Sequence, residues 1–172
     1  IKAFIHSMRM DITKSKFTEK EYKEYIYGSA EVVGLMCLKI FCDDDQKFKK
    51  LEENACSLGS AFQKINFLRD IKSDFEERER VYFPNVKYET LNNSQKIEIE
   101  EDIEKDFNHA LVGIKKLPTI ARSGVYLGDA CRRRANRDAV ARLAQYLEFA
   151  VGCRCFAWLW IALLRTGLLC FA

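Results

Sequence analysis

Hydrophobic residues recur three and four positions apart along most of the chain, which is the pattern of helices with one apolar face. The spacing predicts one helix over about residues 18–41, a second over about 49–75 and a third from Asn92 or Ser94 to about 116. No segment alternates apolar and polar residues as a half-buried strand would. We therefore expect an all-α fold.

Polar and proline-containing segments separate these helices. Thr18 is a suitable N-cap for the first helix, because acidic residues follow it in the first turn. The acidic triplet at 43–45 is expected to form a solvated turn rather than a metal site, because three successive residues of a loop point in different directions. A charged stretch runs to Pro84 after the second helix, and Pro118 marks a boundary after the third.

The composition narrows the class of protein. The 172 residues are 48% hydrophobic and 31% charged, which describes a globular chain and excludes disorder. The net charge of +3 is too small to make nucleic acid the expected partner. The odd number of Cys, 7, and the lack of CxxC spacing favour reduced thiols in a cytoplasmic protein and argue against a zinc site. His6 and His109 are too far apart in the sequence to suggest a His-based triad.

The basic residues change type near residue 120. Every Lys lies at or before Lys116, whereas residues 121–172 carry Arg as their basic residue and hold both Trp. We interpret this change as a shift of reading frame or a chimeric join; the alternative is a genuine pair of Arg-rich terminal helices. We therefore treat residues 1–127 as one domain and residues 128–172 as an atypical tail.

Two features of the tail bear on partners. Residues 155–164 form an uncharged apolar run between Arg154 and Arg165, which is short for the roughly 20 residues that a spanning helix needs. A membrane anchor, a buried helix and an out-of-frame segment all remain open for this run. We expect no nucleic-acid partner for the basic cluster of the tail, Arg132, Arg133, Arg134 and Arg137.

Four polar residues of the second predicted helix share one face. At 100° per residue, Gln63, Asn66, Asp70 and Asp74 fall within an arc of about 80°. Toward the N-terminus the same face passes through Gly59, where a solvent-exposed face would carry Lys or Glu. A face that is acidic at one end and small and apolar at the other suits a ligand with an anionic head and an apolar tail.

Asp70 and Asp74 are the candidate metal ligands. Their mutual repulsion at i, i+4 would disfavour the helix by about 0.2–0.5 kcal/mol unless a cation lies between them. Mg²⁺ suits such a pair, because it takes one or two carboxylates, keeps waters and completes its shell with phosphate oxygens. DxxxD spacing is common by chance, so the spacing alone leaves an exposed acidic face as the alternative.

A long segment of this helix resembles a known family. Residues 58–84, LGSAFQKINFLRDIKSDFEERERVYFP, are similar to the second aspartate-rich motif of squalene and phytoene synthases, LGxAxQxxNxxRDxxxD followed by a basic stretch and an aromatic-Pro ending. The matching residues are Leu58, Gly59, Ala61, Gln63, Asn66, Arg69, Asp70, Asp74, Arg80, Tyr82 and Pro84.

Three shorter segments extend the resemblance. Residues 8–11, MRMD, look like the family's GMxxD segment, with Ser7 in place of Gly. Residues 25–34, YIYGSAEVVG, look like its YxYxxAGxVG helix, with Glu31 where Gly is usual. Residues 124–127, GVYL, resemble its last conserved stretch, and the resemblance ends there.

The resemblance implies a helical bundle of the isoprenoid synthase type and a Mg²⁺-dependent prenyltransferase, with Mn²⁺ as an alternative ion. Such enzymes join two prenyl diphosphates head to head through a cyclopropylcarbinyl diphosphate, which ionises and rearranges to a C30 or C40 product. The family's first aspartate-rich motif lies upstream of the GMxxD segment, before Ile1. We therefore expect this chain to hold half of the metal site and not to turn over substrate by itself.

The same resemblance assigns the charged and amide residues. Asp70 and Asp74 would bind the metal, and Gln63 and Asn66 would orient the metal–diphosphate group. Gly59 would lie against the substrate. Arg69 and Arg80 would pair with phosphate. Arg69 projects away from the polar stripe, so a structural ion pair is its alternative role.

Two tyrosines are candidates for stabilising a carbocation by the face of the ring. Tyr25 and Tyr27 lie on opposite sides of their predicted helix. We prefer Tyr27 as the catalytic residue, because it shares a face with Ala30 and Gly34. Tyr25 is then a substrate contact, and a place in the core is the alternative for either ring.

The ERVYFP ending favours the phytoene-forming members of the family, which act on geranylgeranyl diphosphate in carotenoid biosynthesis. A squalene, dehydrosqualene or hydroxysqualene synthase that uses farnesyl diphosphate is the alternative enzyme. A non-catalytic relative that acts as an assembly factor is less favoured, because such relatives tend to lose the aspartates. Peripheral association of a cytoplasmic protein with the membrane is left open.

Overall fold

The computed structural model describes residues 1–42, 44–86, 88–119, 121–122 and 125. The chain divides into two compact units, Ile1–Lys116 and Leu117–Ala172, and the elements below belong to the first. The predictions for the tail, including its helices, its apolar run at 155–164 and its arginine cluster, lie outside the described residues.

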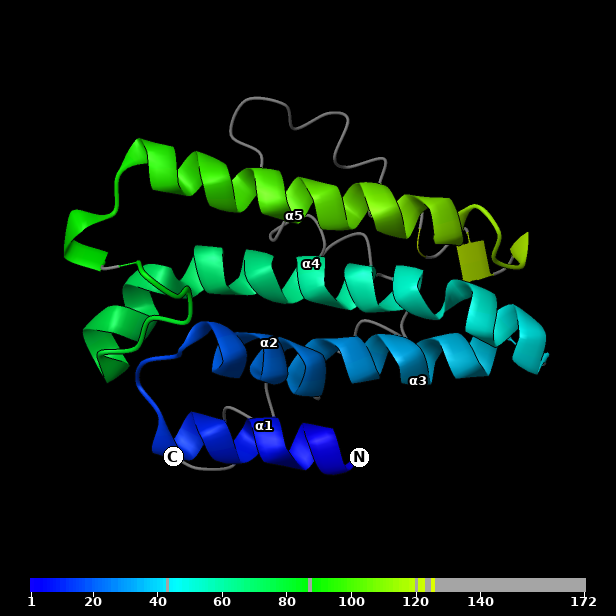
Figure 1. The fold of residues 1–172 in the computed structure, drawn as a ribbon, viewed down its shortest axis with the longest axis horizontal. Coiled ribbons are helices and arrows are strands. Elements are labelled where there is room, and N and C mark those ends of the chain that lie inside the picture. Colours follow the sequence, from blue (N-terminus) through cyan, green and yellow to red (C-terminus); the bar gives the residue numbers. More distant parts are fainter. Residues whose placement is uncertain (43, 87, 120, 123–124, 126–172) are drawn as a thin grey trace. The chain divides into compact units, whose positions relative to one another are not determined.

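The first unit is helical, as expected (Figure 1). Its elements in chain order are α1 (Lys2–Thr13), α2 (Glu19–Ile26), the π-helical turn η1 (Tyr27–Glu31), α3 (Val32–Phe41), α4 (Asp45–Arg78), the 3-10 turn η2 (Tyr88–Thr90) and α5 (Asn93–Ile114). Within the described ranges, β-type pairing is limited to an isolated parallel bridge between Lys16 and Val81. The prediction of an all-α fold is confirmed.

The helix predicted over 18–41 is present, but it contains a π-helical turn. Thr18 begins it with a capping box, in which the Thr18 side chain accepts a hydrogen bond from the Glu21 N–H and the Glu21 carboxylate accepts one from the Thr18 N–H. In η1 the chain closes i→i+5 hydrogen bonds, so α2 and α3 are two α-helical stretches joined by one wider turn.

The helix predicted over 49–75 is longer than expected. It begins at Asp45, because the carboxylate of Asp44 accepts hydrogen bonds from the N–H groups of Gln46 and Lys47 and caps it. It ends at Arg78, where Glu79 adopts a left-handed conformation with φ of 50°. The acidic turn at 43–45 is therefore in part a helix cap.

Helix α1 was not predicted, since its apolar residues do not mark its buried face. Ser7 and Met10 are its buried residues, whereas Ile5 and Ile12 are exposed. The helix packs against η1 and α2.

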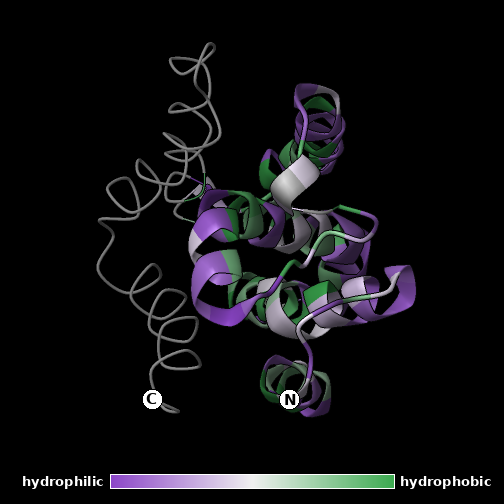
Figure 2. Cartoon of the chain, turned by 90° about the vertical axis from the view of Figure 1, so that its left-hand side faces the viewer, coloured by the Kyte–Doolittle hydropathy of each residue, from purple (hydrophilic) through white to green (hydrophobic). Residues whose placement is uncertain are grey.

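α4 is the central helix of the first unit, with η1 and α3 on one side and α5 on the other (Figure 1). Viewed from the end, hydrophobic residues gather where these helices face one another (Figure 2). Two glycines permit the closest approaches to η1. A Cβ on Gly28 would lie 2.5 Å from the carbonyl oxygen of Ala3, and one on Gly59 would lie 2.6 Å from that of Ala30. No side chain fits at such distances, so the backbones are in contact.

Polar side chains line the contact between α4 and α5, which we call the polar seam. Lys64 Nζ lies 2.5 Å from Asp102 Oδ2 and 2.8 Å from Asp106 Oδ2, and Ser60 Oγ donates to Asp106 over 2.7 Å. One turn further along, Ser57 Oγ and His109 Nδ1 are 2.7 Å apart. These pairs join successive positions of two antiparallel helices and so fix the axial register of α4 against α5.

An aromatic cluster forms the core between α1, α2 and α4. Its buried members are Met10, Phe17, Tyr25, Ile26, Phe67, Tyr82 and Phe83. The rings of Phe67 and Tyr82 stack with centroids 4.1 Å apart and planes 9° apart.

Among the helices described, none combines the length and hydrophobicity that crossing a bilayer requires.

Candidate active site

Asp70 and Asp74 lie in the last turns of α4, one turn apart on the same side of the helix. The Asp70 carboxylate accepts two hydrogen bonds from the adjacent Arg69, with Nε to Oδ1 at 2.7 Å and a terminal nitrogen to Oδ2 at 2.6 Å. Arg69 thus forms the ion pair that the sequence left as its alternative role. The pair is partly exposed, with 37% of the Arg69 and 40% of the Asp70 side chain accessible.

The Asp74 carboxyl group carries the clearest electrostatic signal of the pair. Its burial, followed by the negative charge of Asp70, raises its pKa to about 6, while Arg78 and Arg80 oppose the shift. An acid whose charged form is destabilised by a second carboxylate gains from a bound cation, since the cation compensates both charges. The two groups supply the hard oxygen ligands that Mg²⁺ prefers.

Two carboxylates make only part of a metal site. Within the portion of the chain that the structure describes, no group of three or more His, Cys, Asp or Glu side chains could hold a metal ion. Mg²⁺ is commonly bound by one or two carboxylates together with waters and substrate phosphates. The residues present fit that mode of binding.

Gln63 and Asn66 lie on α4 between Gly59 and the two aspartates, at different depths. Gln63 is 5% exposed, and its Oε1 atom has no hydrogen-bond partner among the described residues. An unpaired buried amide oxygen costs about 1–3 kcal/mol, so this position favours a ligand that supplies the missing partner. Asn66 is half-buried.

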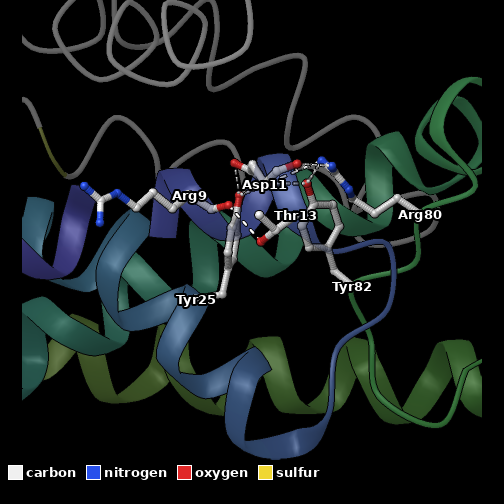
Figure 3. A network of polar contacts seen from close by, with 6 residues as sticks. All are labelled: Arg9, Asp11, Thr13, Tyr25, Arg80 and Tyr82. Atoms are coloured by element: carbon white, nitrogen blue, oxygen red, sulfur yellow. Dashed lines mark hydrogen bonds and ion pairs between the residues drawn. The ribbon is translucent and has the colours of Figure 1, made fainter. Parts of the chain in front are cut away.

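Asp11, at the end of α1, is the centre of a buried network (Figure 3). Tyr25 Oη donates to its two carboxylate oxygens over 3.0 and 2.9 Å, and Tyr82 Oη donates to Oδ1 over 3.1 Å. A terminal nitrogen of Arg80 lies 3.3 Å from Oδ1, and the other donates to the Asp11 carbonyl oxygen. Burial raises the pKa of Asp11, and the hydrogen bond from Tyr25 is the largest opposing effect.

Arg80 is committed to this network. One terminal nitrogen also donates to Tyr82 Oη over 3.0 Å, so both terminal nitrogens have protein partners. Its Nε atom is buried and has no partner in the described part of the chain. Since the ends of the guanidinium are occupied, the predicted contact with phosphate would have to use Nε or replace bonds to Asp11.

The two candidate tyrosines occupy different environments. Tyr25 is 4% exposed and packs in the aromatic cluster, with its ring centroid 5.3 Å from that of Tyr82. Tyr27 is 45% exposed, at the start of η1. Tyr25 thus contacts Asp11 from within the core, whereas Tyr27 lies at the surface.

Gly59 is a point of helix contact. Its Cα faces the backbone of Ala30 and Glu31 in η1. Gly59, the small residue that the sequence suggested for contact with an apolar ligand chain, is used here for close packing of α4 against η1.

Sequence reasoning did not select Asp11 or Tyr82 as site residues. Both stood within recognised motifs, Asp11 in MRMD and Tyr82 in ERVYFP. The available signal was an acid between two apolar residues, Met10 and Ile12. The partners of Asp11 are 14 and 71 positions away in the sequence, beyond the reach of helical periodicity.

The fold and site define an all-α domain with a paired-carboxylate candidate for metal binding. A sequence profile of squalene/phytoene synthases matches residues 1–113. The chain belongs to the squalene/phytoene synthase family.

Two curated relatives are similar to parts of this chain. The chain is 39% identical over 89 residues to a chloroplastic phytoene synthase of an Oncidium hybrid cultivar, covering 48% of this chain and 21% of the relative. It is 32% identical over 147 residues to a 15-cis-phytoene synthase of Synechocystis sp., covering 78% of this chain and 42% of the relative. The chain thus spans less than half the length of these relatives. No solved structure matches it significantly.

Proposed function

We propose that this chain is part of a prenyltransferase that condenses two molecules of geranylgeranyl diphosphate head to head to phytoene through a cyclopropylcarbinyl diphosphate. The observation that carries the proposal is the Asp70–Asp74 pair at the end of α4, where Asp74 is destabilised as an anion. The names of both relatives support phytoene as the product.

In this proposal the carboxylates of Asp70 and Asp74 hold Mg²⁺, or Mn²⁺ in its place. The ion would neutralise charge on the diphosphate and make it a better leaving group. Arg69, which pairs with Asp70, would also interact with the phosphate oxygens in this proposal. Gln63 and Asn66 would orient the diphosphate. The amide oxygen of Gln63, which is buried without a hydrogen-bond partner among the described residues, would accept a hydrogen bond from the hydrated metal–diphosphate group.

The proposed roles of the tyrosines follow from their exposure. Tyr27 stays the proposed catalytic ring because it is accessible to a ligand, whereas a substrate contact by Tyr25 would have to involve a ring that is already packed. The odd number of Cys favours reduced thiols and hence a cytoplasmic protein. We propose that it contacts the membrane peripherally, because substrates with long apolar chains partition into bilayers.

The test is an assay of the protein at its full natural length with geranylgeranyl diphosphate and Mg²⁺. Asp70→Asn should abolish formation of phytoene. Asp45→Asn is the matched control, because Asp45 is on the same helix and also pairs with a cation, Lys39, but lies at the opposite end. Equal activity of Asp70→Asn and the wild type would refute the ligand role.

Product analysis separates the family members. Feeding farnesyl and geranylgeranyl diphosphates in parallel should give a C40 hydrocarbon from the second. A C30 product alone would favour a squalene, dehydrosqualene or hydroxysqualene synthase, and no product from either would favour a non-catalytic relative. Removal of Mg²⁺ with a chelator should stop turnover, and Mg²⁺ or Mn²⁺ should restore it.

A further inference from the structure

The segment that follows α4 is tied to the end of α1. The Arg80 N–H donates to the Asp74 carbonyl oxygen over 3.0 Å, directly after the left-handed residue Glu79 ends the helix. The next residue, Val81, donates to the Ser15 carbonyl oxygen over 3.2 Å. The turn of α4 that carries Asp74 is therefore connected, through Arg80, to the chain that leaves α1.

The Arg80 side chain completes this connection at Asp11. The ion pair is largely buried, with 10% of the Arg80 and 19% of the Asp11 side chain exposed. Arg80 holds both the carboxylate and the backbone carbonyl of Asp11. Breaking such a pair leaves an uncompensated buried charge, so both residues are constrained to one arrangement.

The same carboxylate fixes Tyr25. Both of its oxygens accept from the Tyr25 hydroxyl, and the Tyr25 ring lies against Phe67 of α4, with centroids 5.8 Å apart. A single acid thus sets the position of the end of α4 and of the residue two positions before Tyr27.

From this geometry we propose that Asp11 is a positioning residue for the metal-binding end of α4. It holds Arg80, and through Arg80 the turn that carries Asp74, in the arrangement that binds the metal–diphosphate group. Arg80 then acts on the metal–diphosphate group through the turn that carries Asp74 rather than by direct contact with phosphate. This inference rests on the proposed function, because it assumes that Asp70 and Asp74 bind the metal.

A double-mutant cycle tests it on the full-length protein. The variants are Asp11→Asn, Arg80→Gln and the two combined, and the measurement is the calorimetric affinity for inorganic pyrophosphate at saturating Mg²⁺. Each single variant should bind about 10- to 100-fold more weakly. The combined variant should bind no more weakly than the worse single variant, because both changes break one unit.

Asp106→Asn is the control for a purely structural ion pair. It removes a partner of Lys64 in the polar seam, so it should lower the melting temperature and leave the pyrophosphate affinity unchanged. Additive losses in the combined variant would show that Arg80 contacts phosphate directly and would overturn the proposal. So would an Asp11→Asn protein with the affinity of the wild type.

A second readout does not depend on pyrophosphate binding. With ¹³Cζ-labelled tyrosine, the Tyr25 resonance, assigned by its loss in Tyr25→Phe, should move in Asp11→Asn and stay in place in Asp106→Asn.

If Asp11→Asn does not fold, Tyr82→Phe is the substitute variant. It removes one hydrogen bond to Asp11 and should weaken pyrophosphate binding about 2- to 10-fold.

The outcomes separate the two proposals. Wild-type protein that binds Mg²⁺ and pyrophosphate but forms no prenyl product contradicts the proposed function, while the cycle still decides the role of Asp11. Wild-type protein that binds neither contradicts both. An unmoved Tyr25 resonance in Asp11→Asn contradicts the network itself.

Discussion

At the scale of single residues, the titration of Asp74 makes the stability of the protein depend on pH. Its pKa of about 6 in the folded protein lies above the ordinary 3.8. Between these values the folded state binds a proton more tightly than the unfolded state, so the contribution of Asp74 to stability is lost as the pH rises through 6. The carboxylate that would bind a cation therefore destabilises the protein at neutral pH.

Asp74→Asn should stabilise the metal-free protein at pH 7.5 by about 1 kcal/mol once solvent screening of this half-buried group is allowed for. At pH 4 the gain should vanish, because Asp74 is then protonated. Thermal unfolding at the two pH values measures both effects. Asp45→Asn is the control of opposite sign, since Lys39 lowers the pKa of Asp45; a gain in that variant at pH 7.5 would contradict the reasoning.

Gly59 sets the distance between α4 and η1. A methyl group there would lie 2.6 Å from the Ala30 carbonyl oxygen, and backbone cannot move aside as a side chain can. Gly59→Ala should therefore cost about 1–3 kcal/mol of unfolding free energy in urea, despite the better helix propensity of Ala. Glu53→Ala, at an exposed position of the same helix, should stay within about 0.5 kcal/mol of the wild type. Equal stability of Gly59→Ala and the wild type would mean that the helices are further apart.

At the scale of elements, the polar seam determines how α4 and α5 are aligned. Lys64 is the buried member, and it compensates both Asp102 and Asp106. Without Lys64, the negative charge of Asp106 would be uncompensated beside Glu31, whose pKa is already raised by burial and by the charge of Asp106. Lys64 is therefore the cation that compensates the charges of both acids of the polar seam, Asp102 and Asp106.

Lys64→Met should destabilise the protein by about 1–3 kcal/mol, because it leaves Asp106 without its cation. Adding Asp106→Asn should recover part of that loss, since the amide carries no charge. Urea unfolding of the single and double variants measures the difference. A double variant that is less stable than Lys64→Met would show that Asp106 contributes by hydrogen bonding to Ser60 rather than by charge.

Much of the fold and part of the site could be predicted from the sequence. Helices α4 and α5 follow from periodicity and caps, and the stripe from Gln63 to Asp74 follows from 100° per residue, because this stretch of α4 is regular. The assignment of Tyr27 to one face with Ala30 and Gly34 used the same angle across η1, where the turn is wider. The contacts of Asp11 and of Gly59 join elements that are distant in sequence, and local patterns carry no information on such pairs.

At the scale of the whole molecule, ligand binding and folding should be coupled. If only the native state binds Mg²⁺ with pyrophosphate, a ligand concentration of 100 times the dissociation constant should add about 2.7 kcal/mol to the free energy of unfolding. The gain in melting temperature should shrink below pH 6, where protons compete for Asp74. Thermal unfolding with Mg²⁺ alone, pyrophosphate alone and both together measures this. An Asp70→Asn protein that still gains fully from both would place the ligand elsewhere.

The wide turn η1 is equivalent to one residue inserted into an otherwise regular helix. Such an insertion rotates everything after it relative to everything before it. Tyr25, before the insertion, can therefore face Asp11 while Gly34, after it, faces Ala55 of α4. Deleting one residue from η1 would restore an unbroken α-helix, but its two halves could then no longer satisfy both neighbours at once.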